Sequence, residues 1–311
     1  MKTSGYLCLL LACLAFIPGD AMAWDSMGHM IIDEIAYENV RPEVRLRVTE
    51  LARILDSKYN SHKPYNFITA GCYMDDMRAA KDYPYSAWHF VDVPYTPNGM
   101  GYSEMTEPNV LWAFRQSVWI IRNAQATAAQ KSEALAMIMH FAGDIHQPLH
   151  CVDWNDKGGN GYLITGIAFN DFSKKKIPTL HVFWDRAYRY DVKRGKPVEL
   201  YYNLWPSERP DAPAKGIIKN QAAKIMGRYP LASLMDLVKV DDPDFWARES
   251  YRLGCRFGYP RRPHPEDYEV VTLTPWFVGQ AHEIACRRIV LAGYRLANLL
   301  DILFASLGKQ D

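Results

Sequence analysis

The chain has 311 residues, 13% of them aromatic, and its 36 basic and 35 acidic side chains leave a formal net charge of +1 at pH 7. This balance excludes a protein that holds nucleic acid by a bulk positive field, and the lack of any internal repeat in the sequence excludes a repeat architecture. The length is compatible with one large domain.

The first 23 residues predict a removable signal peptide. Lys2 precedes an apolar stretch from Tyr6 to Ile17, and Ala21-Met22-Ala23 supplies a small-x-small cleavage site. The apolar stretch is shorter than the ~20 residues that a membrane span needs, so an uncleaved anchor is the weaker alternative. A lipoprotein signal ending before Cys13 is weaker still. We therefore expect an exported protein, periplasmic or secreted, with no membrane association and a mature chain of residues 24–311.

Cleavage after Ala23 makes Trp24 the mature N-terminus, with His29 five residues later. A free α-amine has a pKa of about 8 and can lose its proton to a metal, while its own carbonyl closes a chelate. The alternative for Trp24 is an ordinary buried aromatic residue at the start of a domain.

Helical periodicity and end signals predict a mainly α fold. The expected helices include Met27–Glu38, Glu43–Leu55, Thr106–Gln125 and the amphipathic Ala281–Ser306. Thr106 is the expected cap of the third helix, with Pro108 in its first turn. The segments Pro206–Lys215 and Tyr259–Glu266 are predicted to be loops.

The run HFAGDIHQPLH, from His140 to His150, carries the strongest chemical signal. A helix predicted over Lys131–Gln147 puts His140 and Asp144 one turn apart on the same face, and Pro148 ends that helix so that His150 can return from the next turn. Imidazoles and a carboxylate at this spacing are typical of a zinc site. A hydrogen-bonded core pair is the alternative for an isolated His-x-x-x-Asp. His146, inside the run, is expected to be structural or to support a ligand.

Two later motifs add to this signal. DKGGN at Asp156–Asn160 and the polar Asn170–Lys176 indicate an excursion between Cys151 and Leu180, interpreted as a small hairpin at the rim of a cleft. In TLHVFWD, His181 and Asp185 are again one helical turn apart and can hold one ion together. A set of histidines and carboxylates without cysteine suits a hydrolytic zinc site with open positions.

Four cysteines remain after signal cleavage, an even number in an exported chain, so one or two disulfides are expected. Three full pairings are possible. We prefer Cys72 with Cys151 and Cys255 with Cys286, because the first two flank candidate ligands.

Together, Trp-x-x-x-x-His at the mature N-terminus, HFAGDIHQPLH, DKGGN and TLHVFWD resemble one family, in the same order along the chain. It is the secreted, zinc-dependent, single-strand-specific nuclease family typified by nucleases P-one and S-one of fungi. The resemblance runs from Trp24 to the closing helix. It implies a single-domain helical bundle of the phospholipase C/P-one nuclease type.

The resemblance also implies three Zn²⁺ ions. One would be held by Asp75, His89, His140 and Asp144, and a second by His150, His181 and Asp185. The third would take the Trp24 amine and carbonyl, His29 and the second oxygen of Asp144, which would bridge two ions. Asp75 rather than its neighbour Asp76 follows from aligning DDMR to the family pattern.

The implied reaction is hydrolysis of single-stranded DNA and RNA to 5′-phosphorylated products, with 3′-nucleotides as further substrates, and we expect the protein to be a monomer. Two nearby cations would lower the pKa of a bridging water toward ~7 and supply hydroxide. Asp92, three residues after His89, stands where the family has its water-orienting carboxylate, so we assign it as catalytic base or positioner; a turn residue is the alternative. With so little net charge, the strand would be held by metals and aromatic stacking.

Two other functions remain open at this stage. A zinc-dependent phospholipase C shares the fold type, but that family uses glutamate as its last ligand where this chain has Asp185. A non-catalytic zinc-binding exported protein would keep the ligands without turnover, and the retained Asp92 argues against it. Arg186, directly after Asp185, departs from many members of the family and can bind phosphate or narrow the cleft.

Overall fold

The computed structural model describes residues 24–305 except 61–63, 79–83, 104, 168–177, 192–195, 198–211 and 262–268. The signal peptide expected at residues 1–23 and the polar stretch Asn170–Lys176 lie outside the described residues. No helix in the described part of the chain is long and apolar enough to cross a membrane.

Ten α-helices make the described chain mainly helical, as predicted. They are α1 (Ser26–Asn39), α2 (Pro42–Ala52), α3 (Tyr73–Met77), α4 (Val110–Arg122), α5 (Ala128–Asp144), α6 (Leu180–Trp184), α7 (Ala212–Arg228), α8 (Leu231–Val238), α9 (Pro243–Leu253) and α10 (Pro275–Leu303). Short 3₁₀ turns cover Ser57–Asn60, Ala70–Cys72, Ser86–His89, Pro148–His150 and Ala187–Arg189, and a π-helical turn covers Gly254–Gly258.

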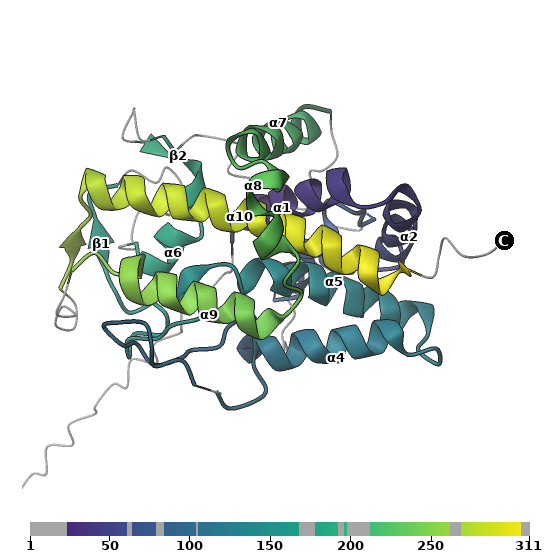
Figure 1. The fold of residues 1–311 in the computed structure, drawn as a ribbon, viewed down its shortest axis with the longest axis horizontal. Coiled ribbons are helices and arrows are strands. Elements are labelled where there is room, and N and C mark those ends of the chain that lie inside the picture. Colours follow the sequence, from purple (N-terminus) through teal and green to yellow (C-terminus); the bar gives the residue numbers. More distant parts are fainter. Residues whose placement is uncertain are drawn as a thin grey trace, which may run out of the picture.

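The longest helix, α10, runs across the molecule and organises the others (Figure 1). It packs along α1, while α4 packs along α5 and α7 covers α1. Gly293 lets α1 and α10 approach closely, because a Cβ there would lie 2.6 Å from side-chain atoms of Ile35. Apolar residues of α10 such as Leu296 and Leu300 are fully buried, so this helix forms the centre of the core.

The strands are short. β1 (Ile164–Thr165) pairs in parallel with β4 (Val271–Thr272), and β2 (Tyr190–Asp191) pairs antiparallel with β3 (Lys196–Pro197). The hairpin expected between Cys151 and Leu180 is therefore only partly correct. Within that excursion Leu163 and Thr179 form an antiparallel bridge, as a hairpin requires. The strand β1, however, pairs with β4, which lies just before α10 in the sequence.

Several predicted boundaries are corrected by cap geometry. Asn109, not Thr106, caps α4, because its side chain accepts hydrogen bonds from the amides of Leu111 and Trp112. The last helix begins at Pro275 rather than Ala281, since Thr274 accepts from the amide of Phe277.

The predicted loop Pro206–Lys215 is also partly wrong, because α7 begins at Ala212. By contrast, α5 begins at a complete capping box. The side chain of Thr127 accepts from the amide of Gln130, and the side chain of Gln130 accepts from the amide of Thr127.

The predicted disulfides are not formed among the described residues. Cys72, Cys151, Cys255 and Cys286 are all buried thiols. The sulfur of Cys72 lies 3.5 Å from the carbonyl oxygen of Ser26, whereas that of Cys151 lies 3.5 Å from the carbonyl oxygen of Ile145. These cysteines therefore behave as small core residues with weak S–H donors.

Candidate metal centre

The centre is built around the end of α5. His140 and Asp144 occupy its last two turns and are fully buried. The helix stops at Asp144, and Pro148 then starts a 3₁₀ turn that carries His150. The side chain of Gln147 accepts from the amide of Leu149 at 2.6 Å, which satisfies the first donor of that turn. The turn thus returns His150 to the region of Asp144, as the sequence predicts.

The beginning of α1 reaches the same place. Trp24 is fully buried, and its indole nitrogen donates to the carbonyl oxygen of Gly143 at 3.0 Å. The His29 ring stacks on that of His140, with centroids 4.2 Å apart. A Cβ at Gly143 would lie 2.9 Å from the His29 ring, so glycine is needed for α1 to come this close to α5.

The short helix α3 contributes Asp75. Its side chain is 4% exposed, and its Oδ1 lies 3.9 Å from His140 Nε2. The neighbouring Asp76 instead accepts a hydrogen bond of 2.8 Å from the hydroxyl of Tyr65. The structure therefore gives the two adjacent carboxylates different surroundings, with Asp75 at the centre and Asp76 in the core.

His89 and His150 are joined by a ribbon of two extended segments. The amide of Val91 donates to the carbonyl oxygen of His150, and the segments pair again at the Pro94–Asp153 bridge. His150 Nδ1 lies 2.6 Å from the carbonyl oxygen of His89. The two motifs, 61 residues apart in sequence, are thus held in fixed register.

The DKGGN loop positions His181 in the same manner. His181 Nδ1 lies 2.6 Å from the carbonyl oxygen of Gly158, and Asp153 Oδ1 accepts from the Gly158 amide. Gly158 has a φ of +60°, and a Cβ there would lie 2.5 Å from the carbonyl oxygen of Leu149. The close approach therefore requires glycine, which also adopts this backbone angle without strain.

Three histidines share one orientation device. His140, His150 and His181 each donate from Nδ1 to a backbone carbonyl, at 2.6 Å in every case. This contact fixes the tautomer in which Nε2 carries the lone pair, which is the arrangement of metal-binding histidines.

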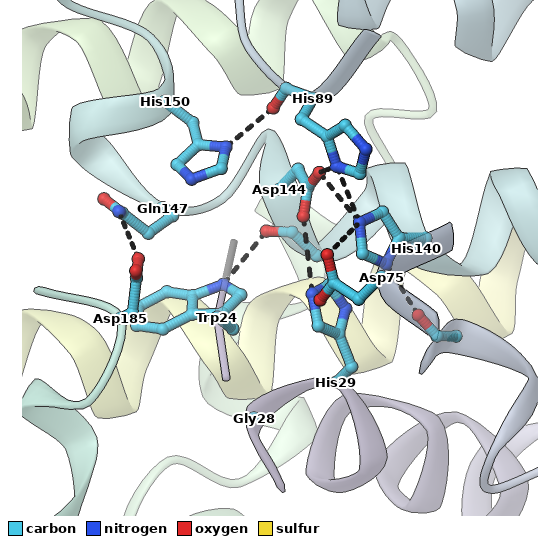
Figure 2. Close-up of polar contacts among 12 residues, drawn as sticks. Trp24, Gly28, His29, Asp75, His89, His140, Asp144, Gln147, His150 and Asp185 are labelled. Atoms are coloured by element: carbon cyan, nitrogen blue, oxygen red, sulfur yellow. Dashed lines mark hydrogen bonds and ion pairs between the residues drawn. The ribbon is translucent and has the colours of Figure 1, made fainter. Parts of the chain in front are cut away.

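The side chains gather into three groups whose possible ligand atoms lie within 4.8 Å of one another. The groups are His89 with His140 and Asp144; His150 with His181 and Asp185; and His29 with Asp75 and His140. All eight side chains expected from the sequence as ligands belong to a group, and Figure 2 shows most of them converging together with Trp24.

Asp144 connects the groups through its two oxygens (Figure 2). Its Oδ2 lies 3.1 Å from His89 Nδ1 and 3.2 Å from His140 Nε2, whereas its Oδ1 lies 3.4 Å from His29 Nε2. One carboxylate thus faces two different sets of imidazoles, which is the geometry of a bridging ligand.

The donor set fits metal ions because several buried polar atoms lack hydrogen bonds. They are both ring nitrogens of His29, both carboxylate oxygens of Asp75 and Oδ1 of Asp144. Leaving so many buried polar atoms unsatisfied in one place is costly. A cation among them would satisfy these atoms, and the oxygen and imidazole ligands match Zn²⁺.

The charges of these side chains also favour a positive charge among them. Burial lowers the pKa of His140, but attraction to Asp144 and Asp75 outweighs it and raises this pKa to about 9. Burial likewise raises the pKa of the Asp144 carboxyl to about 6, against the opposing effect of His140. Coordination of a cation by Nε2 of His140 would require that nitrogen to be unprotonated, so metal binding would depend on pH.

Asp92 follows Val91 on the ribbon and belongs to none of the three groups. It is partly buried, and burial followed by repulsion from Asp153 and Asp156 raises the pKa of its carboxyl to about 7. A carboxyl with this pKa can accept and return a proton near neutral pH.

Sequence reasoning missed two residues of the centre. Arg78 follows Asp75 by one helical turn, with Nη1 3.5 Å from Asp75 Oδ1 and a side chain only 12% exposed. The spacing Asp-x-x-Arg was a usable signal. Gln147 donates from Nε2 to Asp185 Oδ1 at 2.8 Å. The sequence around Gln147 contains no pattern that predicts this contact with a distant segment.

Arg186, whose role the sequence left open, contacts Asp25 within the chain. Its Nε lies 3.9 Å from Asp25 Oδ2, and its side chain is 21% exposed. This guanidinium is therefore directed at the segment that precedes α1.

Comparison with known proteins agrees with the geometry. A family model described as S1/P1 nuclease matches residues 24–305. The chain is similar to Endonuclease 3 of Arabidopsis thaliana, at 24% identity over 93% of this chain and 92% of that protein. It is likewise 24% identical to Endonuclease 2 of the same plant, over 95% of this chain and 96% of the relative. Nuclease P1 of Penicillium citrinum is 23% identical over 91% of this chain and 98% of its own length.

Proposed function

This chain belongs to the S1/P1 nuclease family, and we propose that it is a zinc-dependent phosphodiesterase that hydrolyses single-stranded DNA and RNA to 5′-phosphorylated products, with 3′-nucleotidase activity. The family and the names of its relatives support a nuclease that acts on phosphoester bonds. The observation that carries the zinc requirement is the gathering of eight His and Asp side chains into three groups, where the two oxygens of Asp144 face His89 and His140 on one side and His29 on the other.

In this proposal three ions share the centre. The first is held by Asp75, His89, His140 and Asp144; the second by His150, His181 and Asp185; the third by His29, Asp144 and the main-chain amine and carbonyl of Trp24. His29 also lies within 4.8 Å of Asp75 and His140, so the first and third positions are adjacent. When bound, zinc would supply Lewis acidity and a lowered pKa for a coordinated water.

The side chains of the protein would supply proton transfer, phosphate binding and orientation of the ligands. Asp92, whose pKa lies near neutrality, takes the proton of the attacking water or orients that water. Arg78 is a partly buried cation beside Asp75, and its Nη1 has no hydrogen-bond partner, so it can bind a phosphate oxygen as negative charge develops. His140, His150 and His181 keep their orientation through their carbonyl contacts.

The test is zinc stoichiometry and hydrolysis measured on one purified sample that begins at Trp24. We expect about three zinc ions per chain, as the donor set requires, and turnover of single-stranded DNA and RNA to products with 5′-phosphates. Duplex DNA and a choline phospholipid are the comparison substrates. Less than about two zinc ions per chain, products with 3′-phosphates, or faster cleavage of the phospholipid would contradict the proposal.

A further inference from the structure

The segment before α1 is fastened to the turn after α6 by a buried cluster of side chains, which we call the Asp25 clamp and define as Asp25, Tyr188 and Arg189. The hydroxyl of Tyr188 donates to Asp25 Oδ1 at 2.5 Å, and Arg189 Nη1 donates to Asp25 Oδ2. The Asp25 side chain is 12% exposed and that of Arg189 is 5% exposed. Both charged groups are therefore largely shielded from solvent. A buried ion pair offsets the cost of desolvation only when its geometry is good and its remaining donors and acceptors form hydrogen bonds.

The clamp is linked to two segments that carry candidate ligands, the start of α1 with His29 and the segment with Asp185. Asp25 Oδ1 also accepts from the amide of Gly28 and caps α1, the helix that carries His29. The Asp25 amide donates to the carbonyl oxygen of Asp185 at 3.3 Å. One residue thus connects the beginning of α1 with the segment that bears Asp185.

The same cluster encloses Trp24. The Tyr188 ring meets the indole edge to face, with centroids 6.1 Å apart. A Cβ at Gly28 would lie 2.7 Å from the Trp24 Cβ and 3.4 Å from the Tyr188 ring, so the space has no room for a larger residue. The indole is held on its far side by the Gly143 carbonyl. Trp24 therefore has one position, set by α5 and by the clamp.

From these contacts we infer that Asp25 is a positioning residue, which locks the start of the mature chain to the Asp185 turn and so holds the Trp24 main chain beside His29 and Asp144. A terminal amine on an unfastened chain end would lose conformational freedom on binding a metal. The clamp removes that freedom in advance. This inference rests on the proposed zinc function, because it concerns the ion that Trp24 is proposed to hold.

The experiment compares zinc affinity with the stability of the zinc-free chain. Asp25→Asn keeps an oxygen that can accept from Gly28 and Tyr188 but removes the charge facing Arg189 and, at 3.9 Å, Arg186. The double variant Asp25→Asn/Arg189→Gln also removes the buried guanidinium that would be left without its partner. Tyr188→Phe deletes one hydrogen bond and keeps the ring against Trp24. Asp242→Asn is the matched control, because Asp242 caps α9, is exposed, and accepts only from the amide of Asp244 in its cap contact.

We expect the double variant to bind one zinc ion, the one assigned to Trp24, about tenfold or more less tightly in a chelator competition, the usual size of an effect from a residue that supports ligands. The other two ions and the melting temperature of the zinc-free chain should match those of Asp242→Asn. Tyr188→Phe should show a smaller loss confined to the same ion.

Unchanged affinity for all three ions would overturn the inference. So would a uniform loss of all three together with a lower zinc-free melting temperature, since that is the result of a merely structural role. A wild-type chain that binds fewer than three ions would count against the proposed function instead, so the two failures are distinguishable.

Discussion

At the scale of single residues, Asp144 is the carboxylate that contacts the most histidines of the candidate centre. Its Oδ2 faces His89 and His140 while Oδ1 faces His29, so no other carboxylate among the described residues has contacts of this kind to three imidazoles. Asp92 lies in a different setting. It joins none of the three groups, and its neighbours are other carboxylates rather than imidazoles. The two residues should therefore fail in opposite ways when they are replaced.

Asp144→Ala is expected to remove both ions that the carboxylate is proposed to bridge. Zinc content should fall from about three ions per chain to about one, because His150, His181 and Asp185 form a group without Asp144. Elemental analysis after dialysis against buffered zinc measures this directly. If the alanine variant keeps the wild-type zinc content, Asp144 is not a bridge.

Asp92→Asn is expected to keep the full zinc content while the hydrolysis rate falls on the order of 10²-fold or more. An asparagine cannot take a proton. The pKa of the bare Asp92 carboxyl is about 7, and nearby cations would lower it, so the rate of wild-type enzyme should fall as pH drops below that lowered pKa. The variant should lose this acid limb. A near-normal rate, or an unchanged acid limb, removes Asp92 from the mechanism; Asp242→Asn is again the distant control.

At the scale of elements, α9 and α10 support the turn between Asp144 and His150, two of the candidate ligands. Arg288 donates to the carbonyl oxygen of His146, and Ser250 donates to that of Ile145. Arg295 Nη1 lies 2.9 Å from His146 Nε2, and Glu249 accepts from both arginines. His146 is thus structural, since its other nitrogen donates to the Ala142 carbonyl. The helices α9 and α10, far away in the sequence, thus fix the backbone between Asp144 and His150.

Glu249→Gln should destabilise the zinc-free chain by about 3 kcal/mol at neutral pH, because two buried guanidinium groups lose their counter-charge. Burial alone would raise the pKa of Glu249, but Arg288 and Arg295 outweigh it and hold this pKa below its usual value. The native state therefore favours ionised Glu249, and this stability is present above the unfolded pKa of 4.5 and is lost as pH falls through the lower folded value.

Urea unfolding in the presence of a chelator at several pH values measures this effect. The gap in unfolding free energy between wild type and Glu249→Gln should narrow as pH is lowered below about 4.5. Glu283→Gln is the control, because Glu283 is 44% exposed and pairs with Arg228 at the surface, where such pairs contribute less than about 1 kcal/mol. A gap that stays constant with pH would show that the Glu249 charge is not what matters.

At the scale of the whole molecule, the sequence predicted what depends on local spacing. The helix around His140 and Asp144, the turn at Pro148, and α1 within one residue at each end followed from periodicity and caps. What it missed depends on contacts between distant segments. The helices α7, α8 and α9 were not predicted, and the ribbon that joins Val91 to His150 has no local signature.

The cysteines show the same limit. Export and an even count favoured disulfides, yet the thiols of Cys72 and Cys151 lie against different backbone carbonyls. Pairing requires a specific separation and direction of two side chains, which spacing along the chain does not determine. The Asp25 clamp could not be predicted from the sequence either, since Asp25 lies 163 residues from Tyr188 and 164 residues from Arg189.

The last prediction joins processing to chemistry through the whole chain. If the Trp24 amine is a ligand, nothing can precede Trp24, because one added residue converts a donor amine into a weakly coordinating amide. A chain carrying an uncleaved N-terminal tag should fold, since the described core begins at Trp24, but it should bind the third ion poorly and hydrolyse single-stranded DNA slowly. Trimming with a protease to Trp24, checked by mass measurement, should restore both at matched zinc loading. Equal specific activity in tagged and trimmed protein would exclude the amine as a ligand, and with it the requirement that the mature chain begin at this residue.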